Sequence, residues 1–299
     1  PGPNGTLPAV TLNRNAGPFD GTVAIDVYGF STPLNMGTLG SGNAYLGAYA
    51  TAAYTGSLMA GAGNVYRLGT GGNSATLNIN APTLTGTASL QIGAINNVVA
   101  AQSASAFAGN TGTVALNTPN TYTGTTTLNP SGVLQLGAVG ALGNAALVFN
   151  GGTVQPDTRL GLAQGTQPLT LANNLSLLGD AIFAGSTDLV FTGTLSLGQG
   201  SGPSTRSLTQ NNTTGLVILS GALVDGAGNG AANLNKAGTG AFVLQGANTY
   251  TGLTTISAGA LVVNSDTAIP SASQVVFNGG NLAFWNAVPV QPLYRYVVP

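Results

Sequence analysis

The sequence predicts an all-β chain that winds into a right-handed parallel β-helix, that is, a β-solenoid. Short stretches of alternating apolar and polar residues run along most of the chain, separated by Gly, Asn and Pro. One segment occurs twice, as PNTYTGTTT at 119–127 and as ANTYTGLTT at 247–255. A sustained helical periodicity is missing, and the chain contains no Glu.

Many short strands with frequent turns fit either an antiparallel sandwich or barrel, or a parallel solenoid. The internal repetition and the small, uncharged polar residues, which can stack in ladders from coil to coil, favour the solenoid. Coils of about 20–25 residues, stacked about 4.8 Å apart, are expected. The clearest strand predictions lie at 75–80, 87–93, 112–117, 125–129, 132–137, 145–152, 168–179, 187–198, 215–221, 240–246 and 260–264.

Three parts are expected along the chain. Residues 1–67 hold several prolines and a Tyr/Ala-rich run, which predicts a less regular N-terminal cap with a contact arm. Residues 68–282 are expected to form the solenoid, with repeat units at 109–154 and 237–282. In residues 283–299 proline alternates with large apolar residues, which excludes a central strand and predicts an extended C-terminal arm.

The two repeat units align without a gap, which matches Val133 with Leu261 and Leu147 with Val275. In the second unit, Asn248 is expected to bond its own backbone and Gly252 to adopt a positive φ. Tyr250 is expected to cover the edge of the coil. Strand alternation is expected at Thr254, Ile256, Leu261 and Val263.

Both units share a pattern of Gly, Asn and Tyr at fixed spacing. It comprises Gly112, Asn120, Tyr122 and Gly124 in the first unit, and Lys236, Gly238, Gly240, Gly246, Asn248, Tyr250, Gly252 and Gly259 in the second. This pattern resembles the autotransporter-associated β-strand repeat, found in passenger regions of exported bacterial surface proteins. Phe242 stands where that repeat has Leu, and the first unit lacks the Lys. The resemblance implies a β-helical architecture, export across the cell envelope and a surface role.

Charged residues make up 4% of the 299 residues, against roughly 25% in ordinary soluble domains. The formal net charge is −1, so the chain has no basic face to bind nucleic acid or an anionic membrane. The mean hydropathy is +0.28. No apolar run reaches the ~18 residues of a transmembrane helix, and no signal peptide is expected in this chain, which begins at Pro1.

The absence of His and Cys excludes Ser-His-Asp and Cys-His catalysis and thiolate zinc sites. No cofactor and no catalytic or metal site is therefore expected, and DGAGNG at 225–230 is interpreted as a turn rather than a calcium loop. The alternative to a non-enzymatic protein is a β-helical polysaccharide lyase or hydrolase. Its candidate residues are Asp157 with Arg159, and Asp180 with Asp188 and Arg206.

Low charge leaves little Coulomb repulsion between copies, and an open solenoid end exposes unpaired backbone. These features predict a self-assembling structural protein, the subunit of an extracellular filament, stalk or layer on a bacterial surface. Contacts are expected from residues 1–27 and 283–299, and in particular from Trp285, Pro289, Pro292, Tyr294 and Tyr296. The alternative is an adhesin that binds a surface glycan by stacking Tyr45, Tyr49, Tyr54 or Trp285 on sugar rings.

Overall fold

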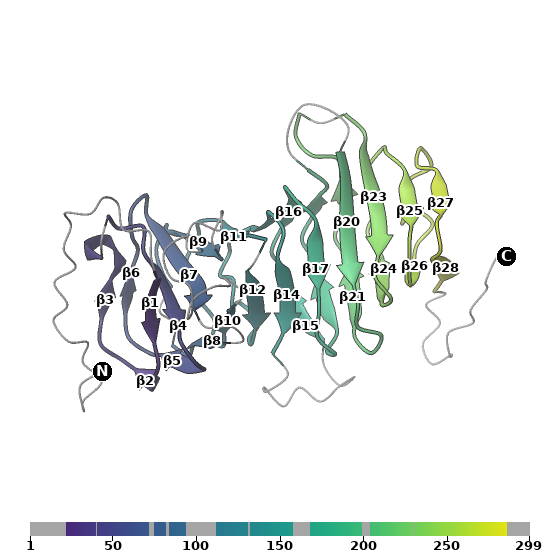
Figure 1. The fold of residues 1–299 in the computed structure, drawn as a ribbon. Coiled ribbons are helices and arrows are strands. Elements are labelled where there is room, and N and C mark those ends of the chain that lie inside the picture. Colours follow the sequence, from purple (N-terminus) through teal and green to yellow (C-terminus); the bar gives the residue numbers. More distant parts are fainter. Residues whose placement is uncertain are drawn as a thin grey trace, which may run out of the picture. The chain divides into compact units, whose positions relative to one another are not determined.

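The computed structural model describes residues 22–39, 41–71, 75–81, 84–93, 112–130, 132–157, 168–198, 204–228 and 230–285. These residues form short β-strands and one 3-10 helix, η2 (Met36–Thr38) (Figure 1). The chain divides into two compact units. Unit 1 comprises Pro1–Leu147 with Gly151–Thr153, and unit 2 comprises Val148–Asn150 with Val154–Pro299.

In unit 1, strands from successive coils pair side by side in parallel, as in Thr22↔Tyr45 and Val114↔Leu134. Wall 1 consists of β1 (Thr22–Ile25), β4 (Tyr45–Ala48), β7 (Val65–Gly71), β9 (Ser89–Ile92) and β11 (Thr126–Leu128). Wall 2 consists of β2 (Tyr28–Phe30), β5 (Ala52–Tyr54), β8 (Thr76–Ile79), β10 (Thr113–Leu116) and β12 (Val133–Leu136). A third, shorter wall pairs β3 (Leu34–Asn35) with β6 (Leu58–Met59).

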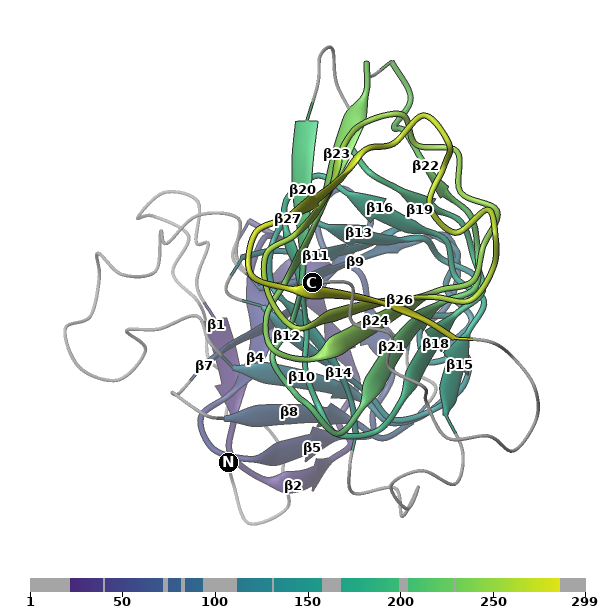
Figure 2. The same ribbon diagram turned by 90° about the vertical axis from the view of Figure 1, so that its right-hand side faces the viewer.

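Unit 2 has three walls, and Figure 2 shows their strands around the core. Wall 1 consists of β13 (Leu147–Phe149), β16 (Leu175–Leu177), β19 (Leu195–Ser196) and β22 (Leu223–Val224). Wall 2 consists of β14 (Thr153–Pro156), β17 (Ala181–Phe183), β20 (Ser204–Gln210), β23 (Ala232–Ala237), β25 (Thr254–Ile256) and β27 (Val275–Phe277). Wall 3 consists of β15 (Leu169–Leu171), β18 (Leu189–Phe191), β21 (Leu216–Leu219), β24 (Ala241–Leu244), β26 (Ala260–Val263) and β28 (Asn281–Phe284).

The predicted parallel β-solenoid is confirmed, and the antiparallel alternative is wrong for the described residues. Their only antiparallel pairing is an isolated bridge between Gly61 and Val65. Coil length varies, from the register Ala241↔Ala260 to the register Thr76↔Thr113, because corners absorb extra residues without disturbing the walls. The handedness of the winding and the terminal cap and arm stay predictions.

The core of unit 2 is built from inward-facing side chains that stack from coil to coil. Phe183 lies at its centre, with its ring centroid 5.5 Å from that of Phe149, 5.9 Å from Phe191 and 5.3 Å from Phe242. Aromatic pairs at such separations add to the free energy gained by burying apolar surface. The core is therefore continuous along the stacked coils of this unit.

In the described part of residues 1–67, coil architecture is already present from Thr22 onward. The Tyr/Ala-rich run supplies β4 and β5, in which Ala48, Ala52 and Ala53 are buried beside the fully buried Tyr54. Small side chains next to large ones fill a narrow core, which gives this unusual composition a packing role. Among the described residues, no helix is long and apolar enough to cross a membrane.

Candidate functional site

The tyrosine of each repeat unit lies inside the coil rather than over its edge. Tyr122 and Tyr250 are fully buried, and each hydroxyl lies 2.6 Å from Oγ1 of a threonine in the following strand, Thr126 and Thr254. Oγ1 of Thr254 also lies 2.8 Å from Oγ of Ser273 in the next coil. Burial raises the pKa of both tyrosines above the ordinary value. The predicted position at the coil edge is therefore wrong, because the threonine gives the hydroxyl a partner inside the core.

The asparagine of each repeat unit, Asn120 or Asn248, joins three successive coils. Oδ1 of Asn248 accepts the backbone N–H of Leu223 at 2.7 Å from the preceding coil, and Nδ2 donates to the carbonyl of Ala268 at 2.6 Å in the following coil. Asn120 makes the equivalent bonds to Leu84 N at 3.3 Å and Ala141 O at 2.8 Å. The prediction that Asn248 bonds its own backbone is wrong. We call this arrangement the asparagine clamp.

Glycine is required in the repeat mainly where two coils approach closely. A Cβ on Gly124 would meet the carbonyl oxygen of Ala88, and one on Gly252 would meet that of Ala232, in each case in the preceding coil. The backbone of Gly252 does not have a positive φ, which corrects the prediction for that residue. Positive φ occurs instead at Gly238 (75°) and Gly259 (63°). Contacts between coils also exclude a Cβ at Gly240 and Gly246, and Gly112 is buried.

The register shows that the two repeat units do not superpose without a gap. Leu134 pairs with Val114 in the first unit, and Leu261 pairs with the matching Phe242 in the second. Leu261 therefore corresponds to Leu134 and not to Val133. The N–H of Thr126 donates to Ala146 and that of Thr254 to Gln274, so the original alignment returns before the next strand. A shorter corner before β26 is thus compensated by a longer corner before β27.

Lys236 is buried within the solenoid, with 1% of its surface exposed. Its Nζ donates to the carbonyls of Ala237, Gly238 and Ala258 at 2.6, 2.8 and 3.1 Å and lies 5.6 Å from the ring centroid of Phe242. Burial lowers the pKa of Lys236 from 10.5 to about 8. The ammonium therefore binds the carbonyls of a corner, as the capping groups of a helix end do.

Side chains on the outer face of wall 2 form a polar ladder across four coils. Asp180 Oδ1 accepts the N–H of Ser207 at 2.8 Å, Asn235 Nδ2 donates to Ser207 Oγ at 3.1 Å, and Ser257 Oγ donates to Asn235 Oδ1 at 2.7 Å. The predicted stacking of small polar residues is thus present. Figure 1 shows β17, β20, β23 and β25, which carry or flank these residues, side by side.

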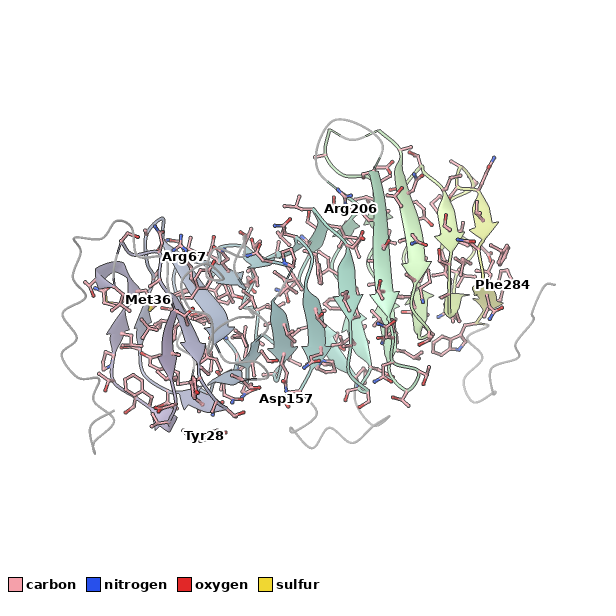
Figure 3. All side chains as sticks on the ribbon, in the orientation of Figure 1. Tyr28, Met36, Arg67, Asp157, Arg206 and Phe284 are labelled. Carbon is pink, nitrogen blue, oxygen red and sulfur yellow. The ribbon has the colours of Figure 1, made fainter. Side chains whose placement is uncertain are left out.

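The candidate catalytic residues do not form one cluster in the described part of the chain. Asp188 Oδ1 accepts the N–H of Leu216 at 2.8 Å, and Arg206 Nε donates to the carbonyl of Leu177 at 3.0 Å. Asp157 is buried, and Figure 3 shows it far from Arg206 within unit 2. Arg159 lies outside the described residues. Asp180 and Asp188 each bind a backbone N–H of the next coil, and none of the described residues gather into a group of three or more potential metal ligands.

In the predicted turn DGAGNG, the carboxylate of Asp225 also accepts hydrogen bonds from backbone N–H groups, as those of Asp180 and Asp188 do. Its Oδ1 accepts the backbone N–H of Ala232 at 2.9 Å, and its Oδ2 accepts the hydroxyl of Thr251 at 2.8 Å from the next coil. Both carboxylate oxygens also contact the N–H of Thr251, at 3.2 and 3.1 Å. The carboxylate therefore holds the corner between two coils together.

The last described coil of unit 2 is open. Phe277 and Phe284 have 54% and 56% of their surfaces exposed, although they stand in register above Ile256 and Val263, which are buried. Strands β27 and β28 are the last members of their sheets among the described residues, and Figure 3 shows Phe284 on β28 at that end. Inward-pointing side chains that would be covered by a further coil are thus exposed together with two strand edges.

The tyrosines proposed to stack on sugars differ in exposure. Tyr45 and Tyr54 are buried, with 7% and 0% exposed, so the stacking prediction is wrong for both. Tyr49 is 57% exposed, and Trp285 is half-buried. Tyr28, which the sequence analysis did not single out, is 70% exposed. Tyr28 stands two residues before the buried Phe30, so strand alternation would have placed it on the inward face. The positive φ of Gly29 (89°) and a register shift between Tyr28 and Phe30 interrupt that alternation, and no signal in the sequence identified Tyr28 as exposed.

Of the five single residues predicted to mediate assembly, only Trp285 lies within the described part. Its N–H donates to the carbonyl of Val263 at 2.8 Å, so the chain still follows wall 3 at this point. Pro289, Pro292, Tyr294 and Tyr296 lie outside the described residues, as do residues 1–21 of the predicted N-terminal contact segment.

Comparison with known protein families agrees with the resemblance found in the sequences of the two repeat units. The family model of the passenger-associated-transport-repeat matches residues 110–136 and 234–263. Both stretches include the asparagine clamp and the buried tyrosine. No curated protein and no solved structure matches the chain.

Proposed function

We propose that this chain, which carries two copies of the passenger-associated-transport-repeat from the passenger regions of exported bacterial surface proteins, is a non-enzymatic structural protein that self-associates through the open coil of unit 2. The repeat residues support a structural role, because they bind neighbouring coils. The clamps at Asn120 and Asn248 and the carboxylates of Asp180, Asp188 and Asp225 all hold backbone groups of adjacent coils.

The exposure of Phe277 and Phe284 is the observation that carries the self-association proposal. One coil earlier, Ile256 and Val263 occupy the same two columns with 0% and 6% exposed. Contiguous exposed apolar side chains mark sites of association in soluble proteins. An unpaired strand edge beside them adds backbone donors and acceptors for a further strand. A second copy of the chain can supply both kinds of contact.

Electrostatics favours the association of copies. A formal net charge of −1 spread over 299 residues produces almost no long-range repulsion between two molecules. Short-range apolar contacts therefore decide whether the molecules associate. Weak dependence on salt concentration is expected, because few exposed charge pairs are available to be screened.

Sedimentation velocity over a concentration series tests this proposal. The purified chain is expected to form larger species as its concentration rises, whereas Phe277→Asp and Phe284→Asp should remain monomeric because each places a charge at the apolar end. Ile182→Asp is the matched control, since Ile182 is 38% exposed on the side of the solenoid, in β17. A chain that stays monomeric at all concentrations, or a control that loses association equally, would refute the proposal.

A second candidate function is glycan binding by unit 1, supported by two exposed tyrosines at one corner of adjacent coils. The N–H of Tyr49 donates to Ile25 O at 3.0 Å, and the N–H of Ala53 donates to Val27 O at 3.2 Å, so the corners that carry Tyr28 and Tyr49 stack on each other. Aromatic faces with 70% and 57% of their residue surface exposed suit contact with sugar rings.

A glycan array, followed by titration of any hit, tests this second function. Tyr28→Ala and Tyr49→Ala should each weaken binding to the same glycan. Met59→Ala, which alters a side chain in unit 1 that is 59% exposed, should leave binding unchanged. Binding that resists both tyrosine substitutions, or that falls equally in the Met59 variant, would remove the glycan-binding proposal.

A further inference from the structure

The first described coil of unit 1 differs from the open coil of unit 2 in the exposure of its core. In the first coil, the side chains of Ile25, Phe30 and Leu34 are buried. In the open coil, Phe277 and Phe284 each have more than half of their surface exposed. A second copy that docked on the first coil would gain no apolar burial from the core of unit 1, because that core is already covered there.

The open coil is best matched by an apolar surface that also has a free strand edge. Val276, Phe277 and Phe284 are exposed together on β27 and β28, and these strands are the last of their sheets in the described part of the chain (Figure 2). On the side of wall 2, by contrast, the exposed Ile182 has the polar Thr209 as its neighbour in the register. The surface with both required properties is the open coil of another copy.

The exposed tyrosines of unit 1 form a different kind of surface. Tyr28 and Tyr49 lie on stacked corners, and each ring ends in a hydroxyl group. A hydroxyl buried against phenylalanine rings without a hydrogen-bond partner costs free energy. These corners therefore match the open coil less well than a second open coil does.

Two open coils can face each other around a two-fold axis that lies across the end of the stack. Both copies then give and receive the same contacts, so Phe277 and Phe284 of each copy are covered in one step. The axis reverses strand direction, so an edge such as β28 that meets its own copy pairs with it in antiparallel fashion. Backbone geometry allows this pairing at a parallel edge. Each copy uses its one open coil, and nothing is left to bind a third.

Charge does not oppose this contact. Asp266 is the only charged residue in the sequence from 264 to 285, which covers the open coil. Two facing copies therefore bring one carboxylate each. Asp266 is exposed, so water and salt screen the repulsion between the two carboxylates.

We propose that the open coil of unit 2 binds the open coil of a second copy end to end around a two-fold axis, and that association stops at a dimer. This inference rests on the proposed self-association and identifies the partner surface for it. A filament needs two different surfaces that bind each other, whereas a surface that binds itself closes the assembly. A dimer thus takes the place of the filament that the sequence predicts.

The limiting mass of the association provides the first test. In sedimentation equilibrium over a concentration series, the mass should rise to twice that of the 29.3-kDa chain and stay there. Species that keep growing beyond two copies would overturn this inference and leave the self-association proposal standing. A chain that is monomeric at every concentration would overturn both.

Mixing of two variants identifies the partner surface. A dye on Met59→Cys, an exposed site in a chain without Cys, marks the Phe284→Asp variant, and the unlabelled natural chain is added in excess. The labelled variant should bind at least about tenfold more weakly than a labelled chain that keeps Phe284, because every dimer needs two intact open coils. In a head-to-tail pair the variant still offers its other surface, so equal recruitment of both labelled chains would overturn the inference.

Two further labelled variants complete the mixing experiment. Ile182→Asp, on the side of the solenoid, is the matched control for the added charge and should be recruited as strongly as the labelled natural chain. Tyr28→Asp alters the first coil of unit 1 and should also be recruited normally. Loss of recruitment in the Tyr28 variant would show that the tyrosine corner is the partner surface, and equal losses in the Phe284 and Ile182 variants would show that the added charge acts without regard to place. Either result would overturn the end-to-end dimer.

Discussion

The hydroxyl of Tyr122 lies 2.6 Å from Oγ1 of Thr126, and both side chains are fully buried. Tyr250 and Thr254 repeat this contact at the same distance in the second repeat unit. The two contacts differ in one respect. Thr254 has a further partner in Ser273, whereas Tyr122 is the only side-chain partner of Thr126 among the described residues.

This difference predicts unequal effects of the same substitution. Tyr122→Phe should cost roughly 1–3 kcal/mol, because Thr126 would be left buried without a partner. Tyr250→Phe should cost about 0.5–1.5 kcal/mol, since Thr254 keeps its bond to Ser273. Urea unfolding of the two variants measures both values. Equal losses, or a larger loss for Tyr250→Phe, would show that the second partner does not protect Thr254.

The asparagine clamp predicts a large effect for Asn248→Ala. The substitution leaves the N–H of Leu223 and the carbonyl of Ala268 without their side-chain partner, at roughly 1–3 kcal/mol for each unsatisfied buried group. Asn212→Ala serves as the control, because the side chain of Asn212 accepts hydrogen bonds only from the nearby Thr214 in an exposed turn. Its cost should stay below about 1 kcal/mol. A control as damaging as Asn248→Ala would contradict the role of the clamp.

The lowered pKa of Lys236 predicts that the free energy of unfolding rises with pH in the alkaline range. Burial lowers the pKa of Lys236 from 10.5 to about 8. Between these values the unfolded chain holds a proton on this residue that the folded chain has released, so raising the pH favours folding. The stabilisation is fully present above 10.5 and is lost as the pH falls through about 8. Urea midpoints at pH about 8 and about 10 measure it.

Lys236→Met is the control for this pH effect. The variant loses the three carbonyl contacts, which changes its absolute stability, but its stability should not rise across the same window. The change with pH, and not the absolute value, is therefore the informative quantity. If both proteins gain stability to the same extent, another group is responsible for the rise.

The raised pKa values of the buried tyrosines predict that the free energy of unfolding falls as the pH rises further. Burial raises the pKa of Tyr54 from 10.0 to about 12, and it raises the pKa of Tyr122 and Tyr250 as well. Their contribution to stability is fully present below about 10 and is lost as the pH rises toward the folded values, because the unfolded chain then ionises first. Absorbance of tyrosinate at pH about 11 should increase when urea unfolds the protein. No increase would show that these hydroxyls ionise in the folded state.

Much of the fold could be predicted from the sequence because strand alternation is a local signal. The predicted strand at 112–117 contains β10 (Thr113–Leu116), and the one at 260–264 contains β26 (Ala260–Val263). The buried positions Thr254, Ile256, Leu261 and Val263 follow the predicted alternation. A period of two residues identifies the inward face of each strand without knowledge of its neighbours.

The contacts between coils could not be predicted in the same way. Asn248 binds Leu223 and Ala268, which are remote in sequence, and no property of the residues near Asn248 identifies these partners. An alignment of the two repeat units does not reveal corners of different length when a shorter corner is followed by a longer one. This is the case for the corners before β26 and before β27. Tyr49 and Tyr54 lie in one run of similar residues, and only the register of β5 places Tyr54 inside.

Val243 and Val262 are buried although they point away from the core of unit 2, and this burial did have a signal in the sequence. In β24 and β26 the consecutive residues Phe242–Leu244 and Leu261–Val263 are apolar on both sides of the strand. Unbroken apolar runs of strand length are typical of sheets that are buried on both faces. An interpretation based on inward alternation alone overlooks this second face.

The asparagine clamp affects how unfolding spreads through the stack. In the simplest description of repeat proteins, each repeat interacts only with its immediate neighbours. A single amide that holds Leu223 on one side and Ala268 on the other makes the order of the third coil depend on that of the first. Fraying that begins at the exposed phenylalanines should therefore stop at Asn248 until three layers separate together, so the stack melts in blocks rather than rung by rung.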